Sequence, residues 1–214
     1  AFDPEKARAL LGAAGYPVLR VGDGRRAEGF PAVELLFNGE DGAHRSVAVA
    51  IQDMWRRELG VTVTLRAEEW KVMLANVRSG QFQIARGGWV ADFNHPHTFL
   101  DTFRSTSPQN ATGWSDRDFD ALIERASQAP DPQESLRLYH LAERRALAEA
   151  PRIPLFFSTG ATLVKPWVKG FHGNGQGLDL VRWMWIDPEW RAHPDDDPAS
   201  TPLELPPMGR LAGP

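Results

Sequence analysis

The chain has 214 residues, 42% of them hydrophobic, and a formal net charge of −4. This is enough apolar material for the core of one large domain, and the negative charge argues against a nucleic-acid surface and against attraction to anionic membranes. The sequence contains no cysteine, which excludes disulfides and cysteine-based metal sites. No apolar run approaches the roughly 20 residues that a membrane-spanning helix needs.

The N-terminal region predicts a helix followed by a loop. Asp3 is a favourable N-cap, Pro4 suits the first helical position, and Gly15 ends the apolar stripe that follows. Residues 18–31 are rich in glycine, arginine and proline and predict a loop. Because the chain opens on a helix and shows no signal peptide, we expect a cytoplasmic protein, a mature product or an internal fragment.

Strands and helices then alternate up to residue 90. A short apolar run at 33–37 predicts a buried strand, and residues 43–59 predict a helix with Val47, Ile51, Met54 and Trp55 on one face. Alternating residues at 61–66 predict a half-buried strand, and residues 69–80 predict a short helix. This alternation predicts an α/β lobe with parallel strand pairs.

The second half of the chain is predicted to be mainly helical before it returns to short strands. One helix is expected to start at Ser115 or Asp116, and a longer one runs from Pro132 to Ala150. Its core candidates are Leu136, Tyr139, Ala142, Ala146 and Leu147. Residues 153–157, 162–164 and 181–186 predict strands, and the tail after Asp187 lacks the apolar periodicity needed to fold.

The stretch from residue 82 to residue 96 is the main candidate for a binding site. A predicted strand at 82–86 ends in Arg86, two glycines break it, and Trp89 and Asp92 follow. Pro96 is expected in the first turn of a helix over 97–101. Strand ends that carry charged and aromatic groups commonly bind ligands in α/β proteins. The alternative is a glycine turn in which Asp92 merely caps the next helix.

Other motifs for catalysis or cofactor binding are weak. The sequence has no phosphate-binding loop, no Gly-x-Ser-x-Gly elbow and no spaced set of serine, histidine and acid. His95 and His97 could hold a metal with Asp92, but Pro96 between them complicates that geometry. We therefore expect no catalytic residues, no metal and no cofactor.

Several stretches carry a family resemblance. They occur in order at residues 2–16, 35–38, 51–61, 69–71, 85–92, 154–157 and 163–170, and they include the sequence Trp-x-Ala-Asp at 89–92. These residues resemble the C-terminal lobe of the oligopeptide- and dipeptide-binding proteins, which are extracytoplasmic solute receptors of bacterial ABC importers. The resemblance spans nearly everything from residue 1 to about residue 186.

The resemblance implies an architecture for the chain. The fold is expected to be a type II periplasmic-binding-protein-like lobe, with a mixed, mostly parallel sheet flanked by helices, and the chain a fragment of a two-lobe receptor. Residues 1–157 would form the ligand-binding lobe, incomplete at its start, and residues 158–190 a segment that returns to the missing first lobe. Residues 191–214 would be a disordered tail. The protein is expected in the periplasm or another extracytoplasmic compartment, membrane-anchored if it is a lipoprotein.

The resemblance also implies roles for individual residues. Asp92 would pair with the α-ammonium of a bound peptide, and Trp70 and Trp89 would form pocket walls. Arg86 would lie near the ligand, although a structural ion pair is an alternative. His44 matches a position that faces the peptide's C-terminal carboxylate in some relatives, and otherwise would be a cap or surface residue.

The implied function is capture of extended peptides and their delivery to ABC permease subunits, without catalysis. Receptors of the same fold carry nickel chelates, haem, opines or oligosaccharides, so another solute is an alternative. A stand-alone hydrolase that uses Asp92 and a histidine, or a partner-binding domain, are alternatives from other classes.

Overall fold

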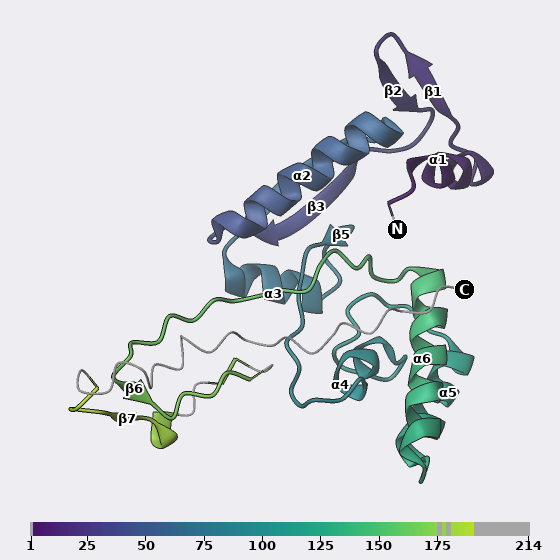
Figure 1. Ribbon diagram of the computed structural model, residues 1–214. Coiled ribbons are helices and arrows are strands. Elements are labelled where there is room, and N and C mark those ends of the chain that lie inside the picture. The colour runs from purple at the N-terminus through teal and green to yellow at the C-terminus, as the bar shows by residue number, and fades with distance from the viewer. Residues whose placement is uncertain (1, 175–176, 179–180, 191–214) are drawn as a thin grey trace. The chain divides into compact units, whose positions relative to one another are not determined.

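The computed structural model describes residues 2–174, 177–178 and 181–190, and the chain forms two compact units (Figure 1). The first unit combines Ala1–Val90 with Pro96–Arg152, and the second combines Ala91–His95 with Ile153–Pro214. The chain therefore passes between the units at three points, after Val90, after His95 and after Arg152.

A three-stranded parallel sheet forms the centre of the first unit. Strand β3 (Val33–Asn38) lies between β4 (Val63–Glu68) and β5 (Ile84–Ala85). Helix α2 (Gly42–Leu59) connects β3 to β4, and α3 (Trp70–Arg78) connects β4 to β5 on the other side of β3. The predicted α/β pattern with parallel pairs is confirmed, although the predicted strand at 82–86 shortens to two residues.

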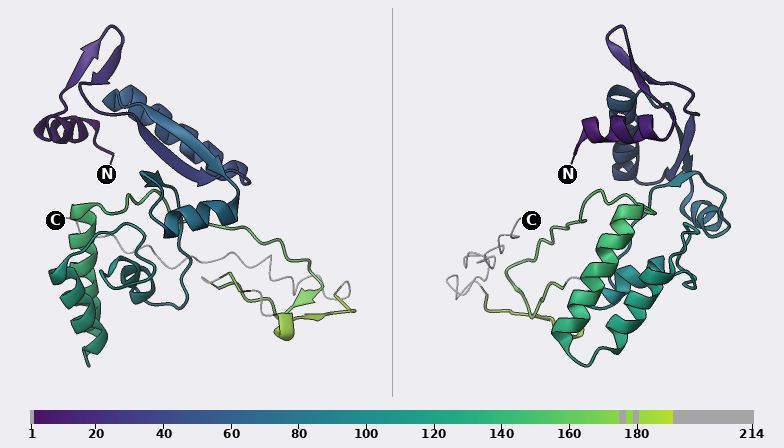
Figure 2. Two further views of the ribbon diagram at one scale, coloured as in Figure 1. Left: turned by 180° about the vertical axis from the view of Figure 1, so that it is seen from behind. Right: turned by 90° about the vertical axis from the view of Figure 1, so that its right-hand side faces the viewer.

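Both faces of β3 are buried. Leu35 and Phe37 pack in a cluster with residues of α2, as expected from the way α2 runs along β3 in Figure 2. Leu36 points to the opposite face and is also fully buried. On that face Asn76 of α3 donates to Glu68 across 2.7 Å, so α3 covers it. Burial on both faces explains why this strand reads as a continuous apolar run rather than an alternation.

The loop predicted for residues 18–31 is wrong, because this region contains an antiparallel hairpin. Strand β1 (Val18–Val21) pairs with β2 (Gly24–Ala27) through a tight turn in which Gly22 has a φ of 58°. Glycine at a positive φ is typical of two-residue hairpin turns. The exposed arginines of both strands conceal the apolar alternation by which a strand is usually recognised. The preceding helix α1 (Pro4–Ala13) begins at its Asp3 cap as predicted.

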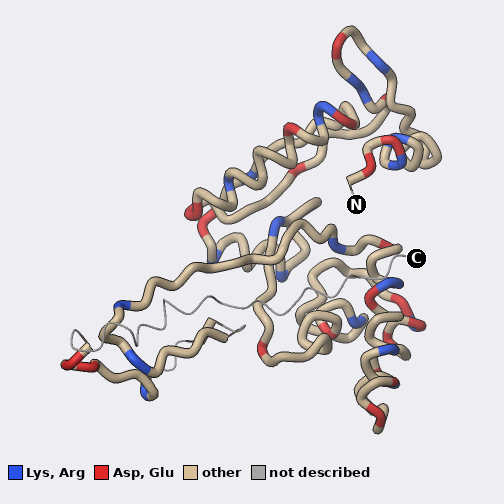
Figure 3. The backbone as a smooth tube through the Cα atoms, in the orientation of Figure 1, with Lys and Arg blue, Asp and Glu red and all other residues tan. Residues whose placement is uncertain are grey.

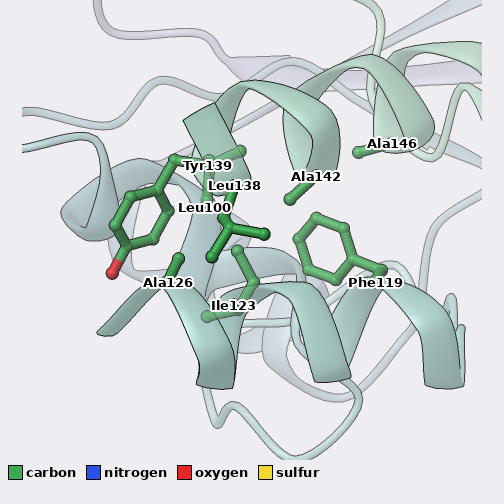
Figure 4. Close-up of a cluster of buried hydrophobic side chains, with 8 residues drawn as sticks. All are labelled: Leu100, Phe119, Ile123, Ala126, Leu138, Tyr139, Ala142 and Ala146. Carbon is green, nitrogen blue, oxygen red and sulfur yellow. The ribbon is translucent and has the colours of Figure 1, made fainter. Parts of the chain in front are cut away.

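Four helical segments build a second core in the same unit. Helix α4 (His97–Leu100) continues into the 3₁₀ helix η1 (Asp101–Phe103), and α5 (Arg117–Gln128) packs against α6 (Pro132–Glu149). No helix in the described ranges has both the length and the apolarity to cross a membrane. The buried side chains drawn in Figure 4 are Leu100, Phe119, Ile123, Ala126, Leu138, Tyr139, Ala142 and Ala146.

Two of the core positions predicted for α6 are wrong. Leu136 and Leu147 are 47% and 50% exposed, whereas Tyr139, Ala142 and Ala146 are buried as predicted. The buried stripe of α6 is narrow, because the residues of α6 in the shared core are Leu138, Tyr139, Ala142 and Ala146. Met54 of α2 is also 44% exposed. The face of α2 that packs against the core carries Ala48, Ile51, Trp55 and Leu59 and does not extend to Met54.

Acidic caps fix where the helices start. Asp116 caps α5 by accepting a hydrogen bond from Phe119 N at 2.9 Å, and it also accepts one from Arg145 Nε of α6 at 2.8 Å. Burial raises the pKa of Asp116, but these two bonds outweigh it and the pKa lies below its usual value. This carboxylate therefore stabilises the fold above its unfolded pKa, and the contribution is lost as the pH falls through the folded pKa. Figure 3 shows acidic and basic residues together along α5 and α6.

The second unit contains little regular structure among its described residues. Strand β6 (Val168–Lys169) pairs antiparallel with β7 (Trp185–Ile186), and η2 (Val181–Trp183) precedes β7. The strands predicted at 153–157 and 162–164 are wrong, and only the end of the one predicted at 181–186 is a strand. Many apolar residues here lie open to solvent, among them Phe157, Leu163 and Trp183. The predicted tail at 191–214 lies outside the described residues.

Aromatic side chains of this second unit are exposed. Trp183 and Trp185 are 60% and 59% accessible, and with Gly170 and His172 they line an open hollow of about 600 Å³. Large apolar surfaces of this kind are uncommon on isolated soluble domains.

The end of α2 generates a prediction about stability. Gly60 has a φ of 66°, and a Cβ there would lie 2.4 Å from backbone atoms of Arg25 and Arg26 in β2. In Gly60→Ala the new Cβ would overlap with this backbone, and alanine would also be strained in the left-handed conformation. We therefore expect the free energy of unfolding, measured by urea denaturation, to fall by about 2–4 kcal/mol.

The matched control is at the end of α3. Gly80 has a φ of 71°, but nothing lies within 4 Å of a Cβ placed there. Gly80→Ala should therefore cost only the left-handed strain, about 1 kcal/mol. Equal losses for the two variants would contradict the close packing of the hairpin on Gly60.

Candidate functional site

Several predicted ligand residues lie at one edge of the parallel sheet. Strands β3, β4 and β5 run in the same direction, so the residues that follow Asn38, Glu68 and Ala85 all emerge at the carboxyl edge. The chain moves from β3 to β4 on one side and then to β5 on the other, which makes the edge of β3 and β5 a topological switch point. Ligands of open α/β sheets bind at such points.

Trp70 is held at this edge by two carboxylates. Glu69 caps α3 by accepting from the backbone N–H groups of Lys71 and Val72 at 3.0 and 3.2 Å. Glu40 accepts from the N–H of Trp70 itself at 3.1 Å. The backbone of Trp70 is thus fixed while the residue remains 45% exposed. This arrangement suits an aromatic wall of a binding site, because the ring is available and its attachment is rigid.

His44 lies in the first turn of α2, with one of its two ring nitrogens unused. Its Nε2 lies 3.7 Å from the carboxylate of Asp41, which caps the helix by accepting from Ala43 N. Its Nδ1 is buried and has no hydrogen-bond partner among the described residues. The capping role considered for His44 belongs instead to Asp41. A buried polar atom without a partner in the protein is a candidate for contact with ligand or water.

Arg86 follows β5 and shows the same feature. Its backbone N–H donates to the carbonyl of Leu36 at 2.8 Å, which fixes the residue beside β3. The guanidinium Nε is buried without a partner in the described part of the chain, and no ion pair of Arg86 is found there. The alternative of a structural ion pair for Arg86 therefore has no support in this structure.

The structural ion pair of this sheet is made by Arg66, which the sequence analysis did not single out. Its guanidinium lies 2.9 Å from Glu34 and 2.7 Å from Glu68, and Asn76 donates to Glu68. The hydrogen bonds that Arg66 donates to Glu34 and Glu68 raise the pKa of Arg66. The hydrogen bond that Asn76 donates to Glu68, together with the one from Arg66, lowers the pKa of Glu68. The available signal was the opposite charge of Glu34 and Arg66 on neighbouring strands.

Asp92 lies in an exposed bend of the second unit, whereas His44, Trp70, Arg86 and Trp89 belong to the first. Trp89 is 38% exposed and is separated from Asp92 by two residues. The next helix, α4, has Pro96 at its N-cap and no side-chain capping bond. Asp92 therefore does not cap that helix, and Pro96 precedes the helix rather than opening it.

The structure also bears on the metal alternative. The rings of Phe93 and His95 stack at a centroid distance of 6.4 Å, and His97 Nδ1 lies 3.0 Å from the hydroxyl of Tyr139. Among the described residues, no three histidine, aspartate or glutamate side chains are grouped so as to hold a metal ion.

Comparison with known proteins identifies the family. The model of the bacterial extracellular solute-binding proteins, family 5 Middle, matches residues 1–111. The periplasmic oligopeptide-binding protein OppA of Salmonella typhimurium is 35% identical over 79% of this chain and 30% of that protein. This chain thus spans about 30% of the length of that curated relative.

Solved structures of similar proteins support the same fold. OppA of Haemophilus influenzae, solved in complex with RPPGFSPFR, matches 86% of this chain and 34% of its own, with 29% identity and a TM-score of 0.72. NikA of Brucella suis, solved in complex with Fe(III)-EDTA, matches 70% of this chain and 31% of its own, with 33% identity and a TM-score of 0.57. The expected type II periplasmic-binding-protein architecture is confirmed.

The contrast between Arg66 and Arg86 generates a prediction. Arg66→Met removes an arginine that two carboxylates hold, so the melting temperature should fall clearly. Arg86→Met removes an arginine with an unpaired buried nitrogen, so the free energy of unfolding should change by no more than about 0.5 kcal/mol. Thermal unfolding of both variants followed by circular dichroism makes the comparison. If Arg86→Met lowered the melting temperature as much as Arg66→Met, Arg86 would support the fold rather than contact a ligand.

Proposed function

Because this chain belongs to the bacterial extracellular solute-binding proteins of family 5, we propose that it forms part of a receptor that captures extended peptides and delivers them to an ABC permease. The relatives compared here are solute-binding proteins, and the proposal assigns no catalytic role to the chain. The receptor would work in the periplasm or another extracytoplasmic compartment, anchored to the membrane if it is a lipoprotein.

The proposal includes a division of the chain between two lobes. Residues 1–157 form most of the C-terminal lobe, residues 158–190 return to the first lobe, and residues 191–214 are a tail. The exposure of Leu163, Trp183 and Trp185 supports the returning segment, because these side chains then have a partner surface to cover them.

One observation carries the proposed function: Asp92 follows β5 in the chain, and the carboxyl edge of the sheet presents the exposed Trp70 together with His44 Nδ1 and Arg86 Nε, which are buried without a partner among the described residues. A carboxylate at this place can accept charge-assisted hydrogen bonds from the α-ammonium of a peptide. Trp70 and Trp89 then line the space for side chains, and His44 and Arg86 supply donors for the carbonyl or carboxylate oxygens of the ligand. The peptide backbone binds extended, by strand-like hydrogen bonds, which gives affinity with little dependence on sequence.

The anchor role of Asp92 predicts a loss of affinity without a loss of fold. Asp92→Asn removes the charge and keeps the shape, so peptide affinity in the complete receptor should fall by about 2–5 kcal/mol, measured by calorimetry. Asp92 caps no helix, so the melting temperature should not show the fall of about 1 kcal/mol in stability that loss of a helix cap would cause.

N-acetylated peptides provide the control for this prediction. Acetylation removes the ammonium, so the unmodified receptor should bind these peptides as weakly as Asp92→Asn binds free ones, and the mutation should add little further loss. Unchanged affinity of Asp92→Asn would refute the anchor role, and binding of a metal chelate in place of peptide would assign the receptor to another solute.

The division into lobes predicts the behaviour of the isolated 214-residue chain. It should fold, but it should bind peptides weakly, because a single lobe leaves half of the ligand's polar groups in water. The exposed surface around Trp183 and Trp185 should also promote self-association. Calorimetric titration and sedimentation velocity measure the two properties. Saturable binding at micromolar concentration would show that the site is complete within this chain.

A further inference from the structure

Arg152 is the last residue of the first unit, and it carries a positive charge that no acidic side chain in the described ranges balances. One guanidinium nitrogen donates to Thr102 Oγ1 at 2.7 Å, and another donates to the carbonyls of Thr102 and Gln109 at 3.1 and 3.3 Å. The guanidinium also lies over the ring of Phe103, 4.3 Å from its centroid. Every one of these partners comes from η1 or from the loop that follows it.

This arrangement is costly to maintain. Burial lowers the pKa of Arg152, because the charged form loses water without gaining a counter-ion. Buried arginines are normally paired with carboxylates. The hydrogen bonds and the contact with Phe103 offset the loss of hydration only while η1 and its loop keep this conformation.

A second costly feature lies two residues earlier. Ala150, which ends α6, has a φ of 51° and is the only non-glycine residue with a positive φ in the described part of the chain. Alanine in this region is strained, and such residues persist where their surroundings hold them. Strain at Ala150 and a half-buried charge without a counter-ion at Arg152 therefore occur together where the chain leaves the first unit.

The 3₁₀ helix η1, which Arg152 contacts, also lies close in the chain to Pro96, where the chain returns to the first unit. The chain returns to the first unit at Pro96, whose carbonyl accepts from the N–H groups of Phe99 and Leu100 in α4. Helix α4 continues directly into η1, and Thr102 of η1 is 2% exposed and donates to the carbonyl of Phe99. Two of the three crossing points between the units, at Pro96 and at Arg152, are thus fixed to the continuous segment α4–η1.

We propose that Arg152 is a positioning residue that fixes the departure of the chain at residue 153 to α4–η1, the segment from which the Asp92 turn extends. Residues 91–95 and the chain from 153 onward then leave the first unit from one rigid anchor. The consequence of this inference rests on the proposed function: the turn that carries Asp92, the residue proposed to bind the peptide, is then attached to the first unit at a fixed point. The anchoring itself is a property of the chain and can be measured without a ligand.

Hydrogen exchange of the 214-residue chain, followed by mass spectrometry, tests the anchor. Arg152→Gln should speed exchange of amides at 98–111 by about tenfold or more, because four contacts to this segment are lost. Exchange within α5 and the first turns of α6 should not change. The control is Arg137→Gln, which removes an arginine of α6 that forms an ion pair with Glu134 and has no contact with η1 among the interactions of the described residues. It should leave exchange at 98–111 unchanged.

Arg152→Lys provides a graded variant. An ammonium retains the charge but not the two-nitrogen grip on Thr102 or the planar contact with Phe103, so exchange should lie between that of the native chain and that of Arg152→Gln. Unchanged exchange at 98–111 in Arg152→Gln would overturn the proposal. Equal acceleration throughout α5 and α6 would also overturn it, because Arg152 would then support the whole fold.

Peptide affinity of the complete receptor separates this inference from the proposed function. Arg152→Gln should weaken peptide binding severalfold at an unchanged melting temperature. Faster exchange with unchanged affinity would overturn the positioning role. If the native receptor binds no peptide, the proposed function fails, and the exchange result alone decides whether Arg152 is the anchor.

Discussion

The parallel alignment of three strands is the constraint on which the rest of this structure depends. Because β3, β4 and β5 point the same way, every connecting helix starts at the same edge, and the side chains at these starts converge there. Burial of β3 on both faces fixes the register, since a shift by one residue would exchange Leu36 for its neighbours on the other face. The candidate ligand residues of the first unit owe their common location to this sheet.

The structure assigns the charges of this sheet to different tasks. Arg66 is held by Glu34 and Glu68 and ties the strands and α3 together, while Arg86, which follows β5, has a buried Nε without a partner among the described residues. Arg152 is half-buried, with backbone and hydroxyl partners, at the point where the chain leaves the unit. The three arginines thus differ in the groups around them. Arg66 and Arg152 bind other parts of the fold, whereas Arg86 has a nitrogen that is available to a ligand.

The sequence predicted the regular elements well where one face of a helix or strand is buried and capped. The starts of α1, α5 and α6 follow from aspartate caps, and α2 from its apolar face and the glycine after it. The hairpin at residues 18–27 was missed because its exposed arginines hide the alternation. The strands expected at 153–157 and 162–164 have no partner strand in the described chain, whereas the end of the one expected at 181–186 pairs with β6. The network of Arg66 and the anchor of Arg152 join residues distant in sequence, and no local pattern reveals such contacts. Trp89 and Asp92 were proposed as site residues because a strand end, a glycine break and the family resemblance lie in one stretch, and Trp70 was proposed because the resemblance also covers residues 69–71.

The proposed function requires that Asp92, which follows β5 in the chain, binds the amino end of a peptide and that Trp70 and Trp89 contact the same ligand. The most direct measurement is a crystal structure of the complete receptor with a bound tripeptide. The account predicts a carboxylate oxygen of Asp92 within hydrogen-bonding distance of the peptide α-ammonium, about 2.7–2.9 Å, with Trp70 and Trp89 in contact with the ligand. An α-ammonium bound by another residue, with Asp92 beyond hydrogen-bonding distance of the peptide, would contradict it.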